Sequence, residues 1–142
     1  MRISFVRHSI LNRGGDRMVL EYANYLANNG HEVTIWANQI NTVFNISPSV
    51  KINYLSVKSK SGTVVKTLLT KFPADIIIAD IIAIASLLSL WNSGKIVYFA
   101  QDYDEAYYKS LLMRWLIRIL YFYGLTLRRI PVIAVSNDLG KL

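Results

Sequence analysis

The stretch Arg13-Gly14-Gly15-Asp16-Arg17 lies between an apolar run, Ile3 to Val6, and an amphipathic pattern that begins near Met18. The run is typical of a buried strand, and the pattern has the apolar spacing of a helix. A strand that enters a helix through glycines exposes backbone N–H groups, and glycine lets a ligand approach them closely. The helix N-terminus adds about half a positive charge. This arrangement predicts an anion site, most often for phosphate; a tight turn that binds nothing is the alternative.

The sequence after this turn carries a second part of the same pattern. Gly30 follows the helical residues as a C-cap glycine, and a second strand is predicted over Glu32–Ala37. The run from Gly14 to Ile35 resembles the N-terminal signature of retaining glycosyltransferases of the GT-B architecture (glycosyltransferase family four, group 1). That signature reads Gly-Gly-x-Glu-Arg, a helix, and then Gly-His-x-Val. Asp16 stands where the signature has Glu, whereas four other positions match: Arg17, Gly30, His31 and Val33.

The remaining chain alternates between predicted strands and helices. Strands are expected at 2–7, 32–37, 51–57, 75–79, 96–100 and 131–135, and helices at 16–29, 64–71, 81–91 and 104–128. Residues 8–13, 38–49 and 56–63 are predicted to be loops, and Ser136-Asn137 to cap a last helix. Such alternation predicts an α/β fold, a Rossmann-like, doubly wound parallel sheet.

The resemblance extends to the later strands. Residues 131–136 resemble the last strand of the family's N-terminal domain, and 99–103 resemble a strand that ends in His-Asp in many members. Residues 1–142 are therefore expected to form one Rossmann-like, acceptor-side domain, the N-terminal half of a GT-B architecture. The resemblance implies a C-terminal donor-binding domain, which is absent here together with the family's pair of glutamates.

Ligands of doubly wound sheets bind outside the carboxyl ends of the strands. The residues at these ends are the candidate substrate-binding residues: Gly14, Gly15, Gln101, Asp102, His8 and Arg13. Gln101 stands where the resemblance implies His; glutamine cannot serve as a general base, but it can hydrogen-bond a sugar hydroxyl or merely precede a helix. The role of Asp102 is left open, and no catalytic residue is assigned.

Other polar residues are given structural roles. Asp104 and Glu105 are expected to favour the N-terminus of the long helix electrostatically. His31 is expected to be structural, between the helix end and the second strand. Since the two histidines have no spaced carboxylate or thiol partners, no metal site is predicted.

The composition restricts the class of protein. The 142 residues are 53% hydrophobic, contain no cysteine and carry a net charge of +7. No signal peptide or membrane-spanning segment is recognised, so a cytoplasmic location is expected. Blocks of basic residues without acids indicate an anionic partner or a solvated basic surface. Without a reading helix or base-stacking aromatic residues, no nucleic acid is expected.

The predicted helix 104–128 has two faces. Its core face is predicted to carry Leu112, Leu116, Ile119, Leu120 and Tyr123. Its outer face combines basic residues with apolar ones such as Ile117 and Tyr121, which suits the inner face of an anionic membrane. The candidate membrane-surface residues are Arg114, Arg118, Arg128 and Arg129. Coverage of this face by the chain's own strands or by a missing domain is the alternative.

The resemblance implies a hexosyltransferase that moves a sugar from a nucleotide-sugar to a glycan or lipid-linked acceptor, without a metal or other cofactor. The chain alone is expected to be inactive, because the cleft of such an enzyme needs both domains. Two alternatives stay open: a non-catalytic Rossmann-like binding or membrane-docking module, and half of a nucleotide-sugar epimerase.

Overall fold

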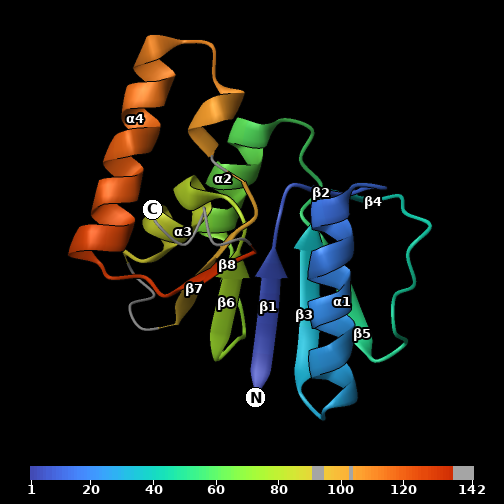
Figure 1. Cartoon of the computed structure of the whole chain (residues 1–142). Helices are drawn as coiled ribbons and strands as arrows, with labels where there is room; N and C mark the ends of the chain where they lie inside the picture. Colours follow the sequence, from blue (N-terminus) through green and yellow to red (C-terminus); the bar gives the residue numbers. More distant parts are fainter. Residues whose placement is uncertain (91–94, 103, 136–142) are drawn as a thin grey trace. The chain divides into compact units, whose positions relative to one another are not determined.

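The computed structural model describes residues 1–90, 95–102 and 104–135 (Figure 1). Six strands form one sheet with the order β5-β3-β1-β6-β7-β8. The pairings β1 with β3, β3 with β5, and β7 with β8 are parallel. Helices connect the strands, so the predicted α/β, Rossmann-like class is confirmed. The chain divides into two compact units, Met1–Ile77 and Ile78–Leu142.

The first unit is built on three parallel strands. These are β1 (Arg2–Val6), β3 (Glu32–Ala37) and β5 (Val50–Tyr54). Ile3 lies opposite Val33, and Phe5 lies opposite Ile35, and all four side chains are buried. Helix α1 (Gly14–Asn28) runs alongside these strands (Figure 1), and its apolar stripe is buried against them: Val19, Leu20, Ala23 and Ala27.

Helix α1 ends as predicted. Gly30 has a φ of +84°, the left-handed conformation that favours glycine. The N–H of Gly30 donates to the carbonyl of Ala27 at 3.1 Å, and the N–H of His31 donates to that of Leu26 at 3.1 Å. These two bonds form a Schellman cap. His31 therefore stands between the helix end and β3, as expected.

Three predicted loops contain regular structure. The short strands β2 (Ser9–Ile10) and β4 (Gln39–Ile40) pair in parallel. Helix α2 (Lys60–Leu69) begins inside the predicted loop 56–63, because the Ser59 hydroxyl accepts from the N–H of Gly62 at 3.0 Å and caps the helix. The polar residues that suggested a loop form the first helical turn, and Thr63 is buried. The unit ends in β6 (Ile76–Ala79), which crosses into the second unit.

The second unit contains α3 (Ile82–Leu88), β7 (Ile96–Ala100) and β8 (Val132–Ala134). Strand β7 has the predicted bounds and is nearly all buried, as a strand inside a parallel sheet should be. Its Tyr98 pairs in register with Val132, and its Ala100 with Ala134. Ser136 and Asn137, predicted to cap a helix, lie outside the described residues.

The predicted long helix 104–128 was wrong. A 3₁₀ turn, η1 (Asp104–Tyr107), is followed by α4 (Leu111–Tyr121), which continues into a π-helical turn, η2 (Phe122–Leu127). The Arg128 N–H closes this turn on the carbonyl of Tyr123 at 2.9 Å. Gly124 lies directly against Ser86 of α3, where an added Cβ would collide with the Ser86 hydroxyl.

The predicted faces of the long helix were also wrong. Ile117 and Tyr121, predicted to lie outside, are buried at 3% and 8% exposure. Leu112, predicted in the core, is 64% exposed. The helix is apolar on most of its circumference, so apolar spacing alone does not identify the buried side. Gly124 lies one turn beyond Tyr121, and its lack of a side chain permits close packing there. Gly124 therefore helps to determine which side of the helix is buried.

Candidate functional site

The loop that follows β1 is organised by the carboxylate of Asp16, which is fully buried. Its Oδ1 forms an ion pair with Nη2 of Arg7 at 2.6 Å. Its Oδ2 accepts from Nε of Arg13 at 2.7 Å and from the N–H of Leu11 at 2.9 Å. Arg7 also reaches the carbonyl of Gly15 at 3.4 Å. Asp16, at the position where the family signature has Glu, thus ties the loop 7–13 to the first turn of α1.

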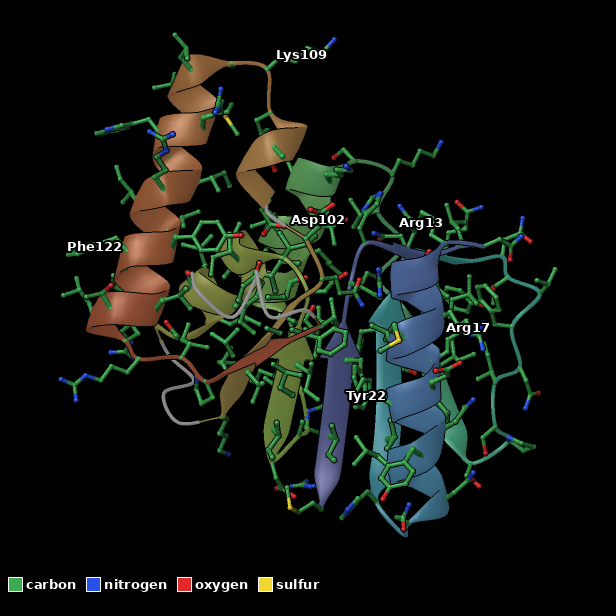
Figure 2. All side chains as sticks on the ribbon, viewed as in Figure 1. Arg13, Arg17, Tyr22, Asp102, Lys109 and Phe122 are labelled. Atoms are coloured by element: carbon green, nitrogen blue, oxygen red, sulfur yellow. The ribbon has the colours of Figure 1, made fainter. Side chains whose placement is uncertain are left out.

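This loop gives the beginning of α1 a positive character. Two guanidinium groups face one carboxylate, which leaves one positive charge in excess. Arg7 is buried, whereas the Arg13 side chain is 59% exposed. No side chain caps α1 at Arg13. Figure 2 shows Arg13 at the beginning of α1, with Arg17 and Tyr22 further along the helix.

Gly14 is the first residue of α1, and nothing lies within 4 Å of a Cβ added there. Its φ is outside the left-handed range. Neither packing nor backbone conformation therefore requires glycine at this position. The predicted placement of the two glycines, at the opening of α1 after the first strand, is confirmed. Their predicted contact with a ligand stays a prediction.

A second polar cluster of this unit contains His8, Asn38 and Thr63. His8 follows β1, Asn38 follows β3, and Thr63 lies in the first turn of α2. The Nδ1 of His8 is 2.7 Å from Oγ1 of Thr63, and Nδ2 of Asn38 is 2.7 Å from the same oxygen. Asn38 also donates to the His8 carbonyl at 3.1 Å and accepts from the N–H of Val57 at 2.7 Å.

In the second unit, Gln101 and Asp102 directly follow β7, as predicted. Gln101 is half-buried and Asp102 is exposed. The nearby Asp104 has a role that the sequence did not indicate. Its Oδ2 accepts from the N–H of Ile82 at 2.7 Å, so it stabilises the beginning of α3 and not that of the basic helix.

The environment of Asp104 is apolar and negatively charged. Burial raises the pKa of Asp104 to about 6, the hydrogen bond from Ile82 opposes this rise, and the charges of Asp80 and Asp102 add to it. Behind it, the hydroxyls of Tyr98 and Tyr121 are 3.0 Å apart, and the Tyr121 hydroxyl accepts from the N–H of Asp104 at 3.2 Å. Burial also raises the pKa of Tyr98.

The structure brings some of the predicted substrate-binding residues together. Arg13, Gly14 and Gly15 share one turn of the first unit, and His8 lies on the same loop. Gln101 and Asp102 form a separate pair in the second unit.

Sequence reasoning missed Arg7, Asn38 and Thr63. Asn38 directly follows a predicted strand, so the rule that selected His8 would have selected it as well. Arg7 was predicted to lie inside the first strand, and an arginine in a strand does not by itself indicate a functional role. Thr63 gave no signal, since its segment was predicted to be a loop.

The candidate membrane-surface residues differ in their surroundings. Arg118 and Arg129 are exposed, and Arg114 is half-buried. Arg128 donates to the carbonyl of Ser89 at the end of α3, so its guanidinium has a structural partner. Large apolar side chains between 40% and 64% exposed occupy the outer side of α4 and the residue after it: Leu112, Trp115, Leu116, Ile119 and Phe122.

Two kinds of feature are absent from the described residues. No helix among them is long and apolar enough to cross a membrane. Residues 1–90, 95–102 and 104–135 also contain no group of three or more His, Cys, Asp and Glu side chains arranged to hold a metal ion.

No protein-family model matches the chain, and no curated protein matches its sequence. Its fold is similar to that of WaaG, "a glycosyltransferase involved in lipopolysaccharide biosynthesis", with a TM-score of 0.55 and 21% identity. The match covers 87% of this chain and 34% of WaaG, so the chain spans about a third of that protein. The fold is also similar to the C-terminal domain of the coenzyme A biosynthesis bifunctional protein CoaBC, with a TM-score of 0.58 and 15% identity over 94% of this chain and 76% of that one. At these identities the likeness shows a Rossmann-like fold, which matches half of a GT-B architecture.

Proposed function

We propose that the chain is the N-terminal, acceptor-side half of a glycosyltransferase that moves a sugar from a nucleotide-sugar to a glycan or lipid-linked acceptor. The observation that carries the proposal is the turn between β1 and α1. It combines an uncapped helix N-terminus, an excess positive charge and a glycine that the fold itself does not require. The similarity of the fold to that of WaaG supports the same proposal.

In this proposal, the beginning of α1 receives the diphosphate of the donor. Backbone N–H groups at a helix N-terminus bind phosphate oxygens, and the helix dipole favours their charge. Arg13 adds an exposed positive charge, whereas buried Arg7 neutralises Asp16 and keeps the loop in shape. Gln101 and Asp102 are the proposed hydrogen-bonding partners of sugar hydroxyls. No metal takes part, and a C-terminal donor-binding domain completes the enzyme.

The diphosphate site can be tested on the chain itself by isothermal titration calorimetry with uridine diphosphate. We expect Arg13→Gln and Gly14→Val to weaken binding about tenfold or more, since a charge-assisted contact contributes about 1.5–3 kcal/mol. Arg17→Gln is the matched control, because Arg17 lies on the same helix but pairs with Glu21 at 2.7 Å. Equal losses in Arg13→Gln and Arg17→Gln would reduce the effect of Arg13 to net charge and contradict the site.

The reaction requires a protein that includes the second domain. Such a protein should transfer sugar only when an acceptor is present, and should keep its activity in a chelator. An epimerase would interconvert nucleotide-sugars without any acceptor, so that outcome would refute the transferase. Wild-type-like transfer by a full-length Gly15→Val enzyme would refute the proposed approach of the diphosphate to Gly15.

The exposed face of α4 favours a second role, reversible docking at the inner face of an anionic membrane. The apolar residues Trp115, Ile119 and Phe122 are 59%, 41% and 58% exposed. Exposed Arg118 lies on the same helix, and residues 111–135 contain no acid. Lys109 precedes the helix and Phe122 lies near its other end (Figure 2). A helix with large apolar side chains and arginines suits the interface of a bilayer.

Vesicle sedimentation tests this role. Binding to anionic vesicles should fall in Trp115→Ser and Ile119→Ser, and in Arg118→Ser at low salt. Leu69→Ser is the control, because Leu69 is 79% exposed on α2. If the wild-type chain ignores anionic vesicles at low salt, membrane docking is refuted. A dimer that disappears in Trp115→Ser would show that a second copy covers the face instead.

A further inference from the structure

The loop 8–13, which leads from β1 into α1, is held at both of its ends. At the end near α1, the buried carboxylate of Asp16 accepts from the N–H of Leu11 at 2.9 Å. At the end near β1, the carbonyl of His8 accepts twice from Asn38, from its backbone N–H at 3.0 Å and from its Nδ2 at 3.1 Å. The second of these attachments depends on residues that lie far from the loop in the sequence.

The hydroxyl of Thr63 completes the attachment at His8. Its Oγ1 is 2.7 Å from Nδ1 of His8, 2.7 Å from Nδ2 of Asn38 and 3.0 Å from the carbonyl of Ser59. A hydroxyl can donate to an imidazole nitrogen or accept from one, so the contact with His8 forms whichever protons the imidazole carries. Because Thr63 lies in the first turn of α2, which Ser59 caps, the loop is joined to the beginning of a second helix.

The segment between β5 and α2 is also fixed on Asn38. Ser56 has a φ of +57°, a left-handed conformation that is unfavourable for residues other than glycine. On one side of it, the N–H of Leu55 donates to the carbonyl of Ala37 at 2.9 Å. On the other side, the N–H of Val57 donates to Oδ1 of Asn38 at 2.7 Å. The strained turn and Asn38 together determine where α2 begins.

Helix α2 contains a second buried threonine for comparison. Thr67 lies one turn beyond Thr63, and both side chains are fully buried. Within the part of the chain that the structure describes, Oγ1 of Thr67 has no hydrogen-bond partner. A buried threonine on this helix therefore does not by itself require the contacts that Thr63 makes. The hydroxyl of Thr63 differs from that of Thr67 in being bonded to the loop 8–13.

We propose that Thr63 is a positioning residue that acts through His8 and Asn38. It holds the loop 8–13 in the conformation that places Arg13 beside the beginning of α1. A loop that is already ordered loses less conformational freedom when a ligand binds. The affinity of the anion site therefore depends on a hydroxyl in another helix. The anion is a diphosphate only if the proposed function holds, whereas the attachment of the loop to Thr63 does not depend on it.

Amide hydrogen exchange, measured by NMR, tests the attachment. The N–H of Asn38 reports on the bond to His8, and the N–H of Asn41 reports on the loop because it donates to the carbonyl of residue 10 at 2.9 Å. In Thr63→Val, which keeps the shape of the side chain but removes the hydroxyl, both amides should exchange about tenfold faster through local opening. The matched control Thr67→Val should leave both rates unchanged, and Thr63→Ser should restore them.

Isothermal titration calorimetry with uridine diphosphate tests the consequence for the anion site. Thr63→Val should weaken binding roughly three- to tenfold, because the ligand must then order the loop. Thr67→Val and Thr63→Ser should bind as the wild-type chain does. None of these variants changes the net charge, so a loss in Thr63→Val alone is not a charge effect. Faster exchange in the loop together with wild-type affinity would overturn the positioning role.

The remaining outcomes also separate the alternatives. Exchange that rises only within α2 of Thr63→Val, with Asn38 and Asn41 as in the wild type, would overturn the attachment. If Thr63→Val does not fold, Asn38→Ala removes the side-chain bonds to His8 and Thr63 without a change in α2, and should give the same two effects. A wild-type chain that binds no uridine diphosphate would refute the diphosphate site, and the exchange rates would still decide whether Thr63 holds the loop.

Discussion

The carboxylate of Asp104 accepts the N–H of Ile82 at 2.7 Å, and so one acid joins the turn after β7 to the first residue of α3. This acid has its pKa raised to about 6 from an ordinary value of 3.8, chiefly by burial. Between these two values, the folded chain holds a proton that the unfolded chain has already released. The free energy of unfolding therefore falls as the pH rises.

We predict that the stability contributed by protonated Asp104 is fully present below about pH 4 and lost as the pH passes 6. The change is on the order of 2–3 kcal/mol, from about 1.4 kcal/mol for each unit of pKa. Asp104→Asn should remove this pH dependence and keep the hydrogen bond from Ile82, since an amide oxygen also accepts. Urea unfolding between pH 4 and pH 7 measures how the free energy of unfolding depends on pH.

The control for this experiment is Asp75→Asn. The N–H and guanidinium of Arg2 lower the pKa of Asp75, so its contribution is present at neutral pH and lost as the pH falls. Asp75→Asn should therefore leave the slope of stability against pH nearly unchanged between pH 4 and pH 7, and should alter it, in the opposite direction, only below about pH 4. If Asp104→Asn leaves the slope between pH 4 and pH 7 unchanged, Asp104 does not hold its proton in the folded chain.

We predict that Gly14→Ala separates folding from ligand binding. Nothing lies within 4 Å of an added Cβ, and alanine is favoured over glycine in a helix by up to about 1 kcal/mol. The variant should unfold at a slightly higher urea concentration, yet bind uridine diphosphate less tightly. Losses in both stability and affinity would mean that the turn needs glycine for its own fold.

We predict a large loss of stability in Asp16→Asn. This substitution leaves the buried guanidinium of Arg7 without its anion, and breaking a buried pair costs about 3–5 kcal/mol. Glu21→Gln removes a carboxylate from the same helix, but its pair with Arg17 is exposed and worth only about 0.3–0.5 kcal/mol. Similar unfolding free energies for the two variants would contradict the role of Asp16.

We predict that Gly124→Ala destabilises the second unit by about 1–3 kcal/mol, the usual cost of overpacking. An added Cβ would collide with the hydroxyl of Ser86, which donates to the carbonyl of Leu120 at 2.8 Å. Ser86→Ala alone loses this hydrogen bond, worth about 1 kcal/mol, but should reduce the cost of Gly124→Ala. Additive effects in the double variant would show that the two residues do not touch.

The strands and the first helix could be predicted because their signals are local. Buried parallel strands are continuous apolar runs, and the cap at Gly30 depends on residues next to it. The faces of α4 could not be predicted in the same way. Its apolar residues surround the helix, and the choice of Ile117 and Tyr121 as the buried pair depends on packing against α3, which lies far away in the sequence.

The residues of the candidate site also divide into those with a local signal in the sequence and those without one. Arg13, Gly14 and Gly15 were recognisable because a strand, a turn and a helix follow one another directly. The hydrogen-bonding partners of His8 were not recognisable, since Asn38 and Thr63 are 30 and 55 residues away along the chain. Thr63 was hidden further by the polar residues around it, which form a capped helical turn where the composition suggests a loop.

The π turn over Phe122–Leu127 makes the chain length adjustable in this region. Such a turn corresponds to one residue inserted into an α-helix, and the wider turn absorbs that residue so that the chain on either side keeps its helical phase. Deleting one residue would therefore restore a regular α-helical turn, with Ile130 still buried and β8 still in register with β7. We therefore expect related sequences to accept the loss of one residue between Tyr121 and Ile130.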